Sequence, residues 1–287
     1  MTAESDISTA VEDALGVSTI SVAELDGGEV GRVHRVSLAD GRTVAAKTGD
    51  TPLEVEAFML SVLGDHGLAV PEVFHAGDDL LVLEYVEGDG EFGPDAQRDV
   101  ARRLAALHEE TPRKALGRFG FPRDTLSGPY RQPNPWTDSW VAFYRDHRLR
   151  RMAEAARDEG LLSASLSDRL DALADDLGSW LPDSPRPSLI HGDVWAENVV
   201  ARDGEVRAFL DPACYVGHAE IELAYADFAG LGEAFFETYD RERGLDSGFF
   251  EGRRAVYQLY PLLEHLRYFE DDRYARKIET RLTDLGY

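Results

Sequence analysis

The 287 residues are enough for one large domain or for two lobes with separate hydrophobic cores. Acidic residues outnumber basic ones by 54 to 30, and the resulting net charge of -24 repels nucleic acids and anionic membranes. A single cysteine, Cys214, excludes an intramolecular disulfide and a cysteine-based metal cluster, and no apolar run approaches the ~18 residues of a membrane span.

The acidic excess is typical of a halophilic cytoplasm, where salt near 1 M screens charges beyond ~3 Å and a high net charge keeps a protein soluble. Lysine occurs only at Lys47, Lys114 and Lys277, so arginine supplies most of the positive charge. The first residues contain neither the basic segment nor the apolar core of a secretory signal. We therefore expect a cytoplasmic protein without nucleic-acid or membrane partners; its oligomeric state stays open.

The first predicted element is a short amphipathic helix, because Ile7, Val11 and Leu15 are spaced by four residues and Gly16 follows as a stop. Two β-rich runs come next, at residues 30–38 and 43–47. Asp40 and Gly41 between them are the signature of a hairpin turn.

A glycine-rich stretch, residues 26–31, precedes this hairpin, and Lys47 ends its second strand. Each feature is a weak signal by itself, since paired glycines usually mark an ordinary loop and a lysine side chain can snorkel from a strand. Their order is that of a nucleotide site, in which a glycine loop covers the phosphates and a lysine reaches their oxygens.

The next helix is predicted to begin with Thr51 as its N-cap, Pro52 at the first helical position and Glu54 closing a capping box. Because capping occupies Glu54, Glu56 is the better candidate to pair with Lys47. The alternative is that Glu56 is a solvated residue on the outer face of the helix.

An apolar strand at residues 80–83 runs into Glu84-Tyr85-Val-Glu-Gly88. A strand that ends in a polar segment with a glycine suits a hinge between lobes, whose backbone groups can read the edge of an adenine. We therefore expect an N-terminal nucleotide-binding lobe over residues 1–87 and a C-terminal catalytic and substrate-binding lobe over residues 88–287.

The second part of the chain has the spacing of buried helices, at residues 96–109 and in the leucine stripe of residues 161–181. Between them lies a loop rich in proline and aromatic residues that includes Gln132-Pro-Asn-Pro-Trp136. Proline makes such a loop stiff, so the loop either shapes a pocket wall or joins two helices.

The chemistry is concentrated in residues 189–200 and 208–212, where Asp193, Asn198 and Asp211 follow short apolar segments. We expect these three side chains to lie close together at the opening of one site. A carboxylate can accept a hydroxyl proton, while an amide oxygen and a second carboxylate suit Mg²⁺, which takes few protein ligands and relies on substrate phosphates. The offset from Asp193 to Asn198 is that of the protein-kinase catalytic loop, and it predicts phosphoryl transfer.

Two further regions contain histidine. His218-Ala-Glu220-Ile-Glu222 has no second histidine at metalloprotease spacing, so its acidic residues are interpreted as helix-start charge and capping. In the last third, a dense apolar helix contains Pro261 and His265, and the ordinary interpretation of His265 is a core residue with its hydrogen bonds satisfied.

With these pieces in order, the sequence resembles the fructosamine kinase (ketosamine 3-kinase) family, within the aminoglycoside-phosphotransferase-like and protein-kinase-like fold. The resemblance covers nearly the whole chain, and its narrower motifs are Gln132-Pro-Asn-Pro-Trp136, Trp195 directly after the catalytic run, and Tyr257-Gln-Leu-Tyr-Pro-Leu-Leu263. It implies an α+β bilobal fold, with a small antiparallel-sheet N-lobe and a larger, mainly helical C-lobe.

The resemblance also implies an activity: ATP- and Mg²⁺-dependent phosphorylation of the 3-hydroxyl of a ketosamine, the adduct of a sugar with an amine. In that family the 3-phosphate makes the adduct decompose, so the role would be deglycation of a protein or metabolite. By this resemblance, Asp193 deprotonates the hydroxyl, and Asn198 and Asp211 are magnesium ligands. On the nucleotide side, Lys47 binds the phosphates with Glu56 orienting it, Gly27 and Gly28 cover the nucleotide, and Glu84 and Tyr85 form the hinge. On the substrate side, Trp195 stacks on the sugar and His265 is a weaker contact.

Two departures from the family pattern stand out. Val194 replaces the usual leucine, and Glu222 stands where aspartate is common, which places any capping by that carboxylate in question. Two alternatives stay open: a kinase of the same fold acting on an aminoglycoside, choline or a plain sugar, and a pseudokinase that binds nucleotide without turnover. The motifs do not distinguish ribulosamine from erythrulosamine or fructosamine, nor a protein-bound amine from a free one.

Overall fold

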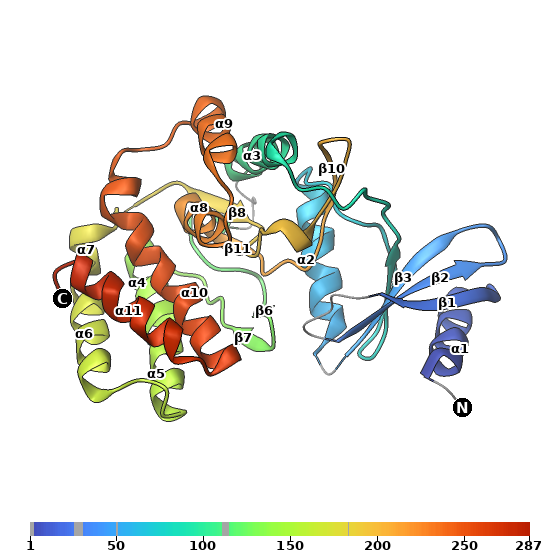
Figure 1. Ribbon diagram of the computed structural model, residues 1–287, viewed down its shortest axis with the longest axis horizontal. Helices are drawn as coiled ribbons and strands as arrows, with labels where there is room; N and C mark the ends of the chain where they lie inside the picture. Colours follow the sequence, from blue (N-terminus) through green and yellow to red (C-terminus); the bar gives the residue numbers. More distant parts are fainter. Residues whose placement is uncertain (1–2, 26–30, 50, 111–114, 183) are drawn as a thin grey trace.

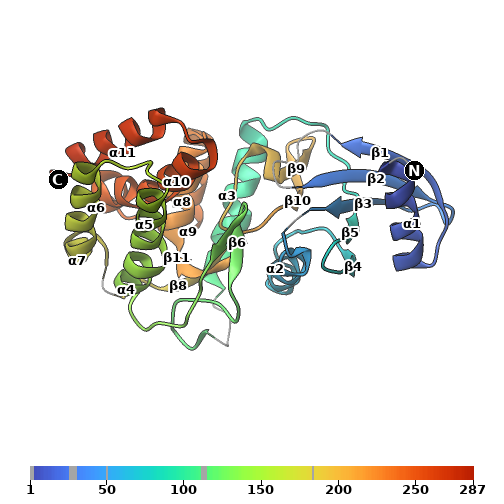
Figure 2. The same ribbon diagram turned by 90° about the horizontal axis from the view of Figure 1, so that it is seen from below.

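The computed structural model describes residues 3–25, 31–49, 51–110, 115–182 and 184–287. Within these residues a small antiparallel sheet with two helices lies beside a larger, mainly helical part (Figures 1 and 2). This is the predicted α+β bilobal arrangement. Gly27 and Gly28 fall outside the described residues.

The N-terminal sheet has the strand order β1-β2-β3-β5-β4, and every neighbouring pair is antiparallel. Its strands are β1 (Thr19–Leu25), β2 (Arg32–Leu38), β3 (Thr43–Thr48), β4 (Val73–Ala76) and β5 (Leu81–Glu84). The predicted turn is present, with Gly41 at φ 90°, a conformation that favours glycine. The sequence pattern does not predict the edge strand β1, because its apolar residues do not alternate strictly. In the structure none of its side chains is buried.

Two helices cover the two faces of this sheet, because successive side chains of a strand point to opposite sides. Helix α1 (Ala3–Leu15) packs Ile7 and Val11 on the face that contains Val82 of β5. Helix α2 (Leu53–Asp65) packs against the other face, where Leu81 and Leu83 lie.

The predicted start of α2 is wrong by one residue. The helix begins at Leu53, the cap position is Pro52 in extended conformation, and no side chain caps it. The carbonyl of Pro52 accepts from the N–H of Val55 at 3.0 Å, so Thr51 lies outside the helix. Glu54 does not close a capping box; it pairs with Arg123 at 2.9 Å instead.

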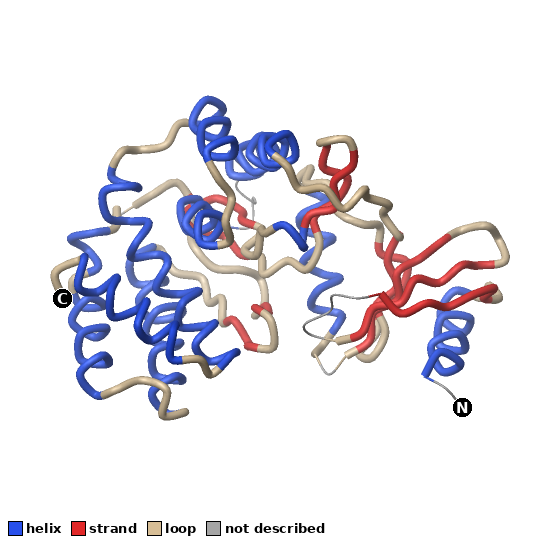
Figure 3. Tube along the Cα trace, in the orientation of Figure 1, coloured by secondary structure: helices blue, strands red, loops and turns tan. Residues whose placement is uncertain are grey.

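The larger part consists mainly of helices (Figure 3). They surround one extended hydrophobic core. Its helices are α3 (Pro94–Glu109), α4 (Trp140–Tyr144), α5 (Arg150–Asp158), α6 (Ala164–Asp175), α7 (Leu177–Trp180), α8 (Ala219–Phe228), α9 (Glu233–Arg243), α10 (Arg254–Phe269) and α11 (Asp272–Asp284). Short two-stranded pairs lie among them: β6 (Thr125–Ser127) with β7 (Tyr130–Gln132), β8 (Pro187–Ile190) with β11 (Tyr215–His218), and β9 (Val199–Arg202) with β10 (Glu205–Phe209).

The leucine stripe of residues 161–181 forms two helices, α6 and α7, and not one. The break lies at Asp176, whose carboxylate accepts from the Ser179 hydroxyl at 2.6 Å and from the Tyr287 hydroxyl at 2.6 Å. The leucines of the stripe are buried as predicted. Helix α10 continues through Pro261, also as predicted.

The chain passes between the two parts at residues 85–93, which contain no helix or strand. Asp89 N–H of this segment donates to the Ala201 carbonyl of β9 at 3.0 Å. The two parts are joined by Phe209 N–H, which donates to the Ala69 carbonyl at 2.8 Å. In the part of the chain that the structure describes, no helix is both long and apolar enough to cross a bilayer.

Candidate active site

Lys47, near the end of β3, contacts two carboxylates from distant elements. Its Nζ lies 2.7 Å from Glu56 Oε2 on α2 and 2.5 Å from Asp211 Oδ1, which follows β10. The ion pair expected between Lys47 and Glu56 is therefore present. Contact with Asp211 brings together residues that are 164 positions apart, one from each part of the molecule.

The three charges of this cluster are unequal. Burial alone would lower the pKa of Lys47, but the charges of Glu56 and Asp211 raise it above its ordinary value. Burial also raises the pKa of Glu56 to about 7 in spite of the lysine. For Asp211 the charge of Lys47 outweighs burial, so its pKa is lowered. The lysine thus stays protonated, and the negative charge rests mainly on Asp211.

Asn198 lies between Asp193 and Asp211. Its Nδ2 donates to Asp193 Oδ2 at 2.8 Å and to the Asp193 carbonyl at 3.0 Å, while its own carbonyl accepts from Leu210 N–H at 2.9 Å. The side-chain oxygen of Asn198 is left as an acceptor, and the Asp211 side chain is half exposed. One amide oxygen and one carboxylate suit Mg²⁺, which takes few ligands from the protein when substrate phosphates supply others.

The backbone around Asp193 has little freedom. Gly192 adopts φ 91°, and a side chain at this position would collide with the carbonyl of Ala213. The segments that follow β8 and precede β11 stay this close because Ala213 N–H donates to the His191 carbonyl at 2.9 Å. Asp211 itself adopts φ 49°, which is uncommon for a residue other than glycine and is often found at functional sites.

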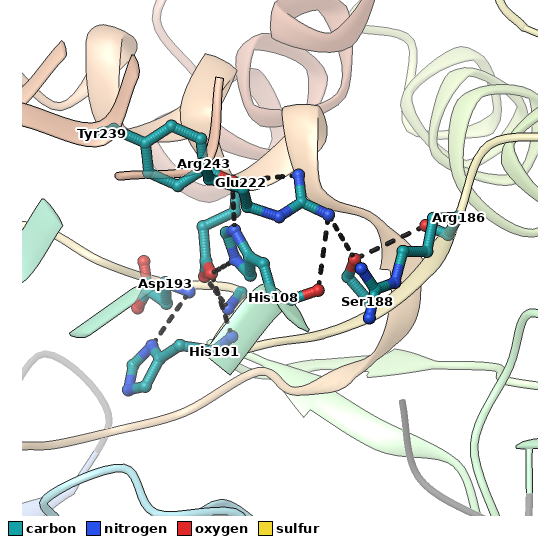
Figure 4. Close-up of polar contacts among 9 residues, drawn as sticks. His108, Arg186, Ser188, His191, Asp193, Glu222, Tyr239 and Arg243 are labelled. Atoms are coloured by element: carbon teal, nitrogen blue, oxygen red, sulfur yellow. Dashed lines mark hydrogen bonds and ion pairs between the residues drawn. The ribbon is translucent and has the colours of Figure 1, made fainter. Parts of the chain in front are cut away.

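Glu222 of α8 holds the segment before Asp193 (Figure 4). Its carboxylate accepts from Gly192 N–H at 2.6 Å and from His191 N–H at 3.3 Å. His108 of α3 lies 2.7 Å from the same carboxylate through Nε2, and the hydroxyl of Tyr239 lies 2.7 Å from its Nδ1. Glu222 is only 1% exposed, so this network is an internal support for the loop.

The network sets the charge states of its members. Burial would raise the pKa of Glu222, but the hydrogen bond and charge of His108 outweigh it, and the pKa is lowered. Burial lowers the pKa of His191, which favours a neutral ring. Glu222 does not cap its own helix, since His218 is the cap residue and no side chain bonds there. The predicted helix-start charge is present, because Glu220 and Glu222 lie in the first turn of α8. The predicted capping is wrong, because the Glu222 carboxylate binds the loop before Asp193.

A cavity of about 870 Å³ opens at Asp193. Trp195 and His265 line it together with Asp193, and the other walls come from α8, α10, α11 and the β6–β7 turn. Glu264 also lines this cavity, and its Oε1 is buried without a hydrogen-bond partner among the described residues. The cavity is large enough for a sugar and an attached amine.

The chain matches the sequence model of the fructosamine kinase family over residues 4–285. It belongs to the fructosamine kinase family. It is 32% identical over 223 residues to a probable ketoamine kinase of Pasteurella multocida, an alignment that covers 76% of this chain and 75% of the relative. It is 30% identical over 228 residues to the chloroplastic protein-ribulosamine 3-kinase of Arabidopsis thaliana, with 77% of this chain and 68% of the relative covered.

Comparison with solved structures agrees with this family assignment. A crystal structure of a candidate fructosamine-3-kinase from Thermobifida fusca superposes with a TM-score of 0.86 at 28% identity, covering 98% of this chain and 99% of the other. An aminoglycoside phosphotransferase crystallised with AMP-PNP and hygromycin B superposes with a TM-score of 0.70 at 17% identity, covering 98% and 99%; at that identity it shows the fold alone. As a member of this kinase family, the protein is a phosphotransferase that acts on a hydroxyl group.

The Gln132-Pro-Asn-Pro-Trp136 loop of this fructosamine kinase family member is organised by Arg148, which is fully buried. Its guanidinium donates to Gln132 Oε1 at 2.9 Å, Asn134 Oδ1 at 2.6 Å and the Pro133 carbonyl at 2.9 Å. The aromatic ring of Tyr215 lies 4.0 Å from the same group. None of residues 132–136 lines the cavity, but residues 127–130 just before them do, so the loop forms part of the cavity wall and also joins elements of the core.

The remaining predicted residues lie apart from the Lys47 cluster. His265 Nδ1 lies 2.8 Å from the Pro261 carbonyl and its ring lies 4.9 Å from Phe228, so it is a satisfied packing residue that also borders the cavity. Glu84 ends β5 and its N–H donates to the Glu72 carbonyl at 2.8 Å. Tyr85 packs against the guanidinium of Arg35 at 4.8 Å. Neither Glu84 nor Tyr85 lines the cavity.

Proposed function

We propose that this protein is an ATP-dependent kinase that phosphorylates the 3-hydroxyl of ketosamines. The observation that carries the proposal is the position of Asp193, which lines the large cavity and is joined through Asn198 to the segment that bears Asp211. A hydroxyl in the cavity and a phosphate held at Lys47 and Asp211 would then meet at Asp193. Phosphoryl transfer needs this positioning more than any covalent step by the protein.

In the proposed reaction each residue has one task. Asp193 orients the sugar hydroxyl and accepts its proton, Lys47 binds phosphate oxygens, and Glu56 holds the lysine in place. Asn198 and Asp211 would hold Mg²⁺, whose charge offsets that of the phosphates when it is bound. Lys47 reaches Asp211 in the structure, and the same ammonium can turn to a phosphate because its stem is flexible.

Substrate and nucleotide are assigned to opposite sides of Asp193. We assign Trp195 to stacking on the sugar, with His265 as a second contact in the same cavity. On the nucleotide side, Gly27 and Gly28 are proposed to cover the phosphates, and Glu84 and Tyr85 to form the hinge beside the adenine. We propose the boundary between the lobes after residue 87, within the connecting segment of residues 85–93.

The biological role proposed here is deglycation, since a 3-phosphoketosamine eliminates its phosphate and frees the amine. The substrate would be a small-molecule or protein-bound ketosamine, and the acidic surface suits a cytoplasm of high salt. No nucleic-acid partner is expected at a net charge of -24.

The test is a panel of coupled ATPase assays at low and high KCl with Mg²⁺. Ribulosamine, erythrulosamine and fructosamine adducts are compared with choline, aminoglycosides and free sugars, and the phosphorylated product is located by NMR. Turnover of the adducts alone, with the phosphate on O3, supports the proposal. Turnover of a different acceptor would favour another small-molecule kinase, and nucleotide binding without turnover of any acceptor would identify a pseudokinase.

A further inference from the structure

The cavity that begins at Asp193 has a positively charged wall on α11. Arg276, Lys277 and Arg281 line it; Lys277 and Arg281 are one turn apart on the same face of the helix, and Arg276 lies beside Lys277. We define these three residues as the cationic wall. Helix α11 packs along α10 on the side of the helical part that is far from the sheet (Figures 1 and 2). The wall therefore faces the substrate end of the cavity and not the nucleotide.

The composition of the chain makes this wall unusual. Acidic residues are in large excess, and most arginines of the described residues pair with a carboxylate. Among the described residues, none of the three members of the cationic wall has a carboxylate partner within ion-pair distance. Arg273, one turn earlier in the same cavity, does pair with Asp271 at 3.1 Å. The wall thus offers positive charge that the protein itself does not neutralise.

Buried hydrogen bonds hold Arg281, one member of the cationic wall, in place. Arg281 donates to Gln258 Oε1 at 2.8 Å, and Gln258, which is 1% exposed, donates through Nε2 to Asp227 Oδ2 at 2.6 Å. Asp227 also accepts from Arg254 at 3.0 Å, so its charge is already compensated. The buried amide fixes the direction of the guanidinium without removing its charge.

Three carboxylates line the cavity. Asp227 is already paired with an arginine, Asp193 marks the reacting end, and Glu264 of α10 has a buried Oε1 without a partner among the described residues. A ketosamine carries a secondary ammonium next to its sugar, and a carboxylate such as Glu264 is its natural partner. Aromatic side chains, among them Phe228 and Tyr274, line the cavity and can contact apolar linking carbons.

We propose that the cationic wall binds a carboxylate on the amine half of the ketosamine, so that the preferred substrates are adducts of free amino acids. This inference rests on the proposed function and specifies its substrate class. The sugar would lie at Asp193 and Trp195, its ammonium near Glu264, and the carboxylate at Arg276, Lys277 and Arg281. A lysine adduct within a protein chain has no free carboxylate of its own at that place.

The experiment compares matched acid and amide substrates. Ketosamines of glycine and glycinamide, and of 6-aminohexanoate and its amide, are assayed for kcat/KM on the sugar that the enzyme prefers. We expect the acid to exceed its amide by about tenfold in at least one pair, as up to three partly exposed ion contacts would give. The preference should shrink in 1 M KCl, because the contacts are exposed to screening.

Variants locate the preference. Arg276→Gln and Lys277→Gln, singly and together, should bring the acid-to-amide ratio toward one while turnover of the amide is unchanged. Arg151→Gln is the matched control: Arg151 is exposed on α5, has no carboxylate partner among the described residues, and does not line the cavity. Its ratio should equal that of the parent enzyme. Unchanged amide turnover also shows that each variant is folded.

The outcomes separate the two proposals. If the acids and amides of both pairs react equally, or if Arg151→Gln abolishes the preference as fully as the double variant, the cationic wall is not a carboxylate site although the kinase assignment stands. An adduct of O-phosphoethanolamine preferred over both acids would replace the carboxylate with a phosphate and overturn the proposal. If no ketosamine of any charge is phosphorylated, the proposed function fails and this inference with it.

Discussion

Replacing Glu222 with glutamine keeps the size of the side chain but removes its charge and one of its two acceptor oxygens. Three donors converge on the carboxylate: Gly192 N–H at 2.6 Å, His191 N–H at 3.3 Å and His108 Nε2 at 2.7 Å. Glutamine can accept from one side only, and its amide group would face another donor on the second side. The variant would therefore bury at least one unpaired donor.

The magnitude follows from this geometry. One unsatisfied buried donor costs about 1–3 kcal/mol, and the loss of a charge-assisted bond adds to it, so we expect about 3 kcal/mol of destabilisation. For a chain of 287 residues this lowers Tm by about 5 °C. Because Gly192 precedes Asp193, loosening it should also lower kcat by about 10- to 100-fold, with little change in KM for ATP.

Differential scanning fluorimetry and steady-state kinetics measure both effects, and Glu220→Gln is the control. Glu220 lies two residues before Glu222 on α8 and is also buried, with 6% exposure. Its carboxylate pairs with Arg253 at 2.6 Å and not with the loop before Asp193. Glu220→Gln should lose stability and retain kcat. Equal kcat values in the two variants would refute the positioning argument, and an unchanged Tm for Glu222→Gln would refute the unpaired donor.

The lowered pKa of Glu222 adds a dependence on pH. A carboxylate whose folded pKa lies below its ordinary value stabilises the fold above that ordinary value and loses the contribution as pH falls through the folded pKa. The difference in Tm between the parent protein and Glu222→Gln should therefore be full at pH 7 and shrink below about pH 4.5. A difference that grows on acidification would contradict the sign.

Three further predictions concern other residues of the site and core. Asp193→Asn should lower kcat by at least about 10³-fold without changing Tm by more than about 2 °C, as measured by coupled assay and fluorimetry, because its task is chemical. Arg148→Gln should lower Tm by about 5 °C, since it removes a buried cation that holds three acceptors of the Gln132-Pro-Asn-Pro-Trp136 loop, and KM for ATP should be unchanged. Burial, with the negative charge of Asp193 in support, raises the pKa of Glu264 to about 7. A raised carboxyl pKa costs folding free energy as pH rises from about 4.5 to 7, so Glu264→Gln should gain about 2 kcal/mol relative to the parent over that interval in urea titrations, and no gain would contradict the burial argument.

Local patterns in the amino-acid sequence determine much of this protein by themselves. The turn at Gly41, the helix that packs Ile7 and Val11, and the Asp193-to-Asn198 spacing are each properties of a few neighbouring residues. Glu56 is separable from Glu54 as the partner of Lys47, although the capping argument for that choice is wrong at Thr51. The pairing succeeds because residues two apart on a helix point in different directions, so only one of the two glutamates can face the strand.

Tertiary structure alone decided the features that depend on distant partners. The role of Glu222 required His108, 114 residues earlier, and Gly192, 30 residues earlier, and no spacing in the sequence encodes those contacts. Arg148 likewise became a core residue only because acceptors and aromatic rings from separate segments surround it. The charge on α11 is visible in the sequence, but its position in the cavity of Asp193 is not, because the packing of α11 on α10 decides which residues line the cavity.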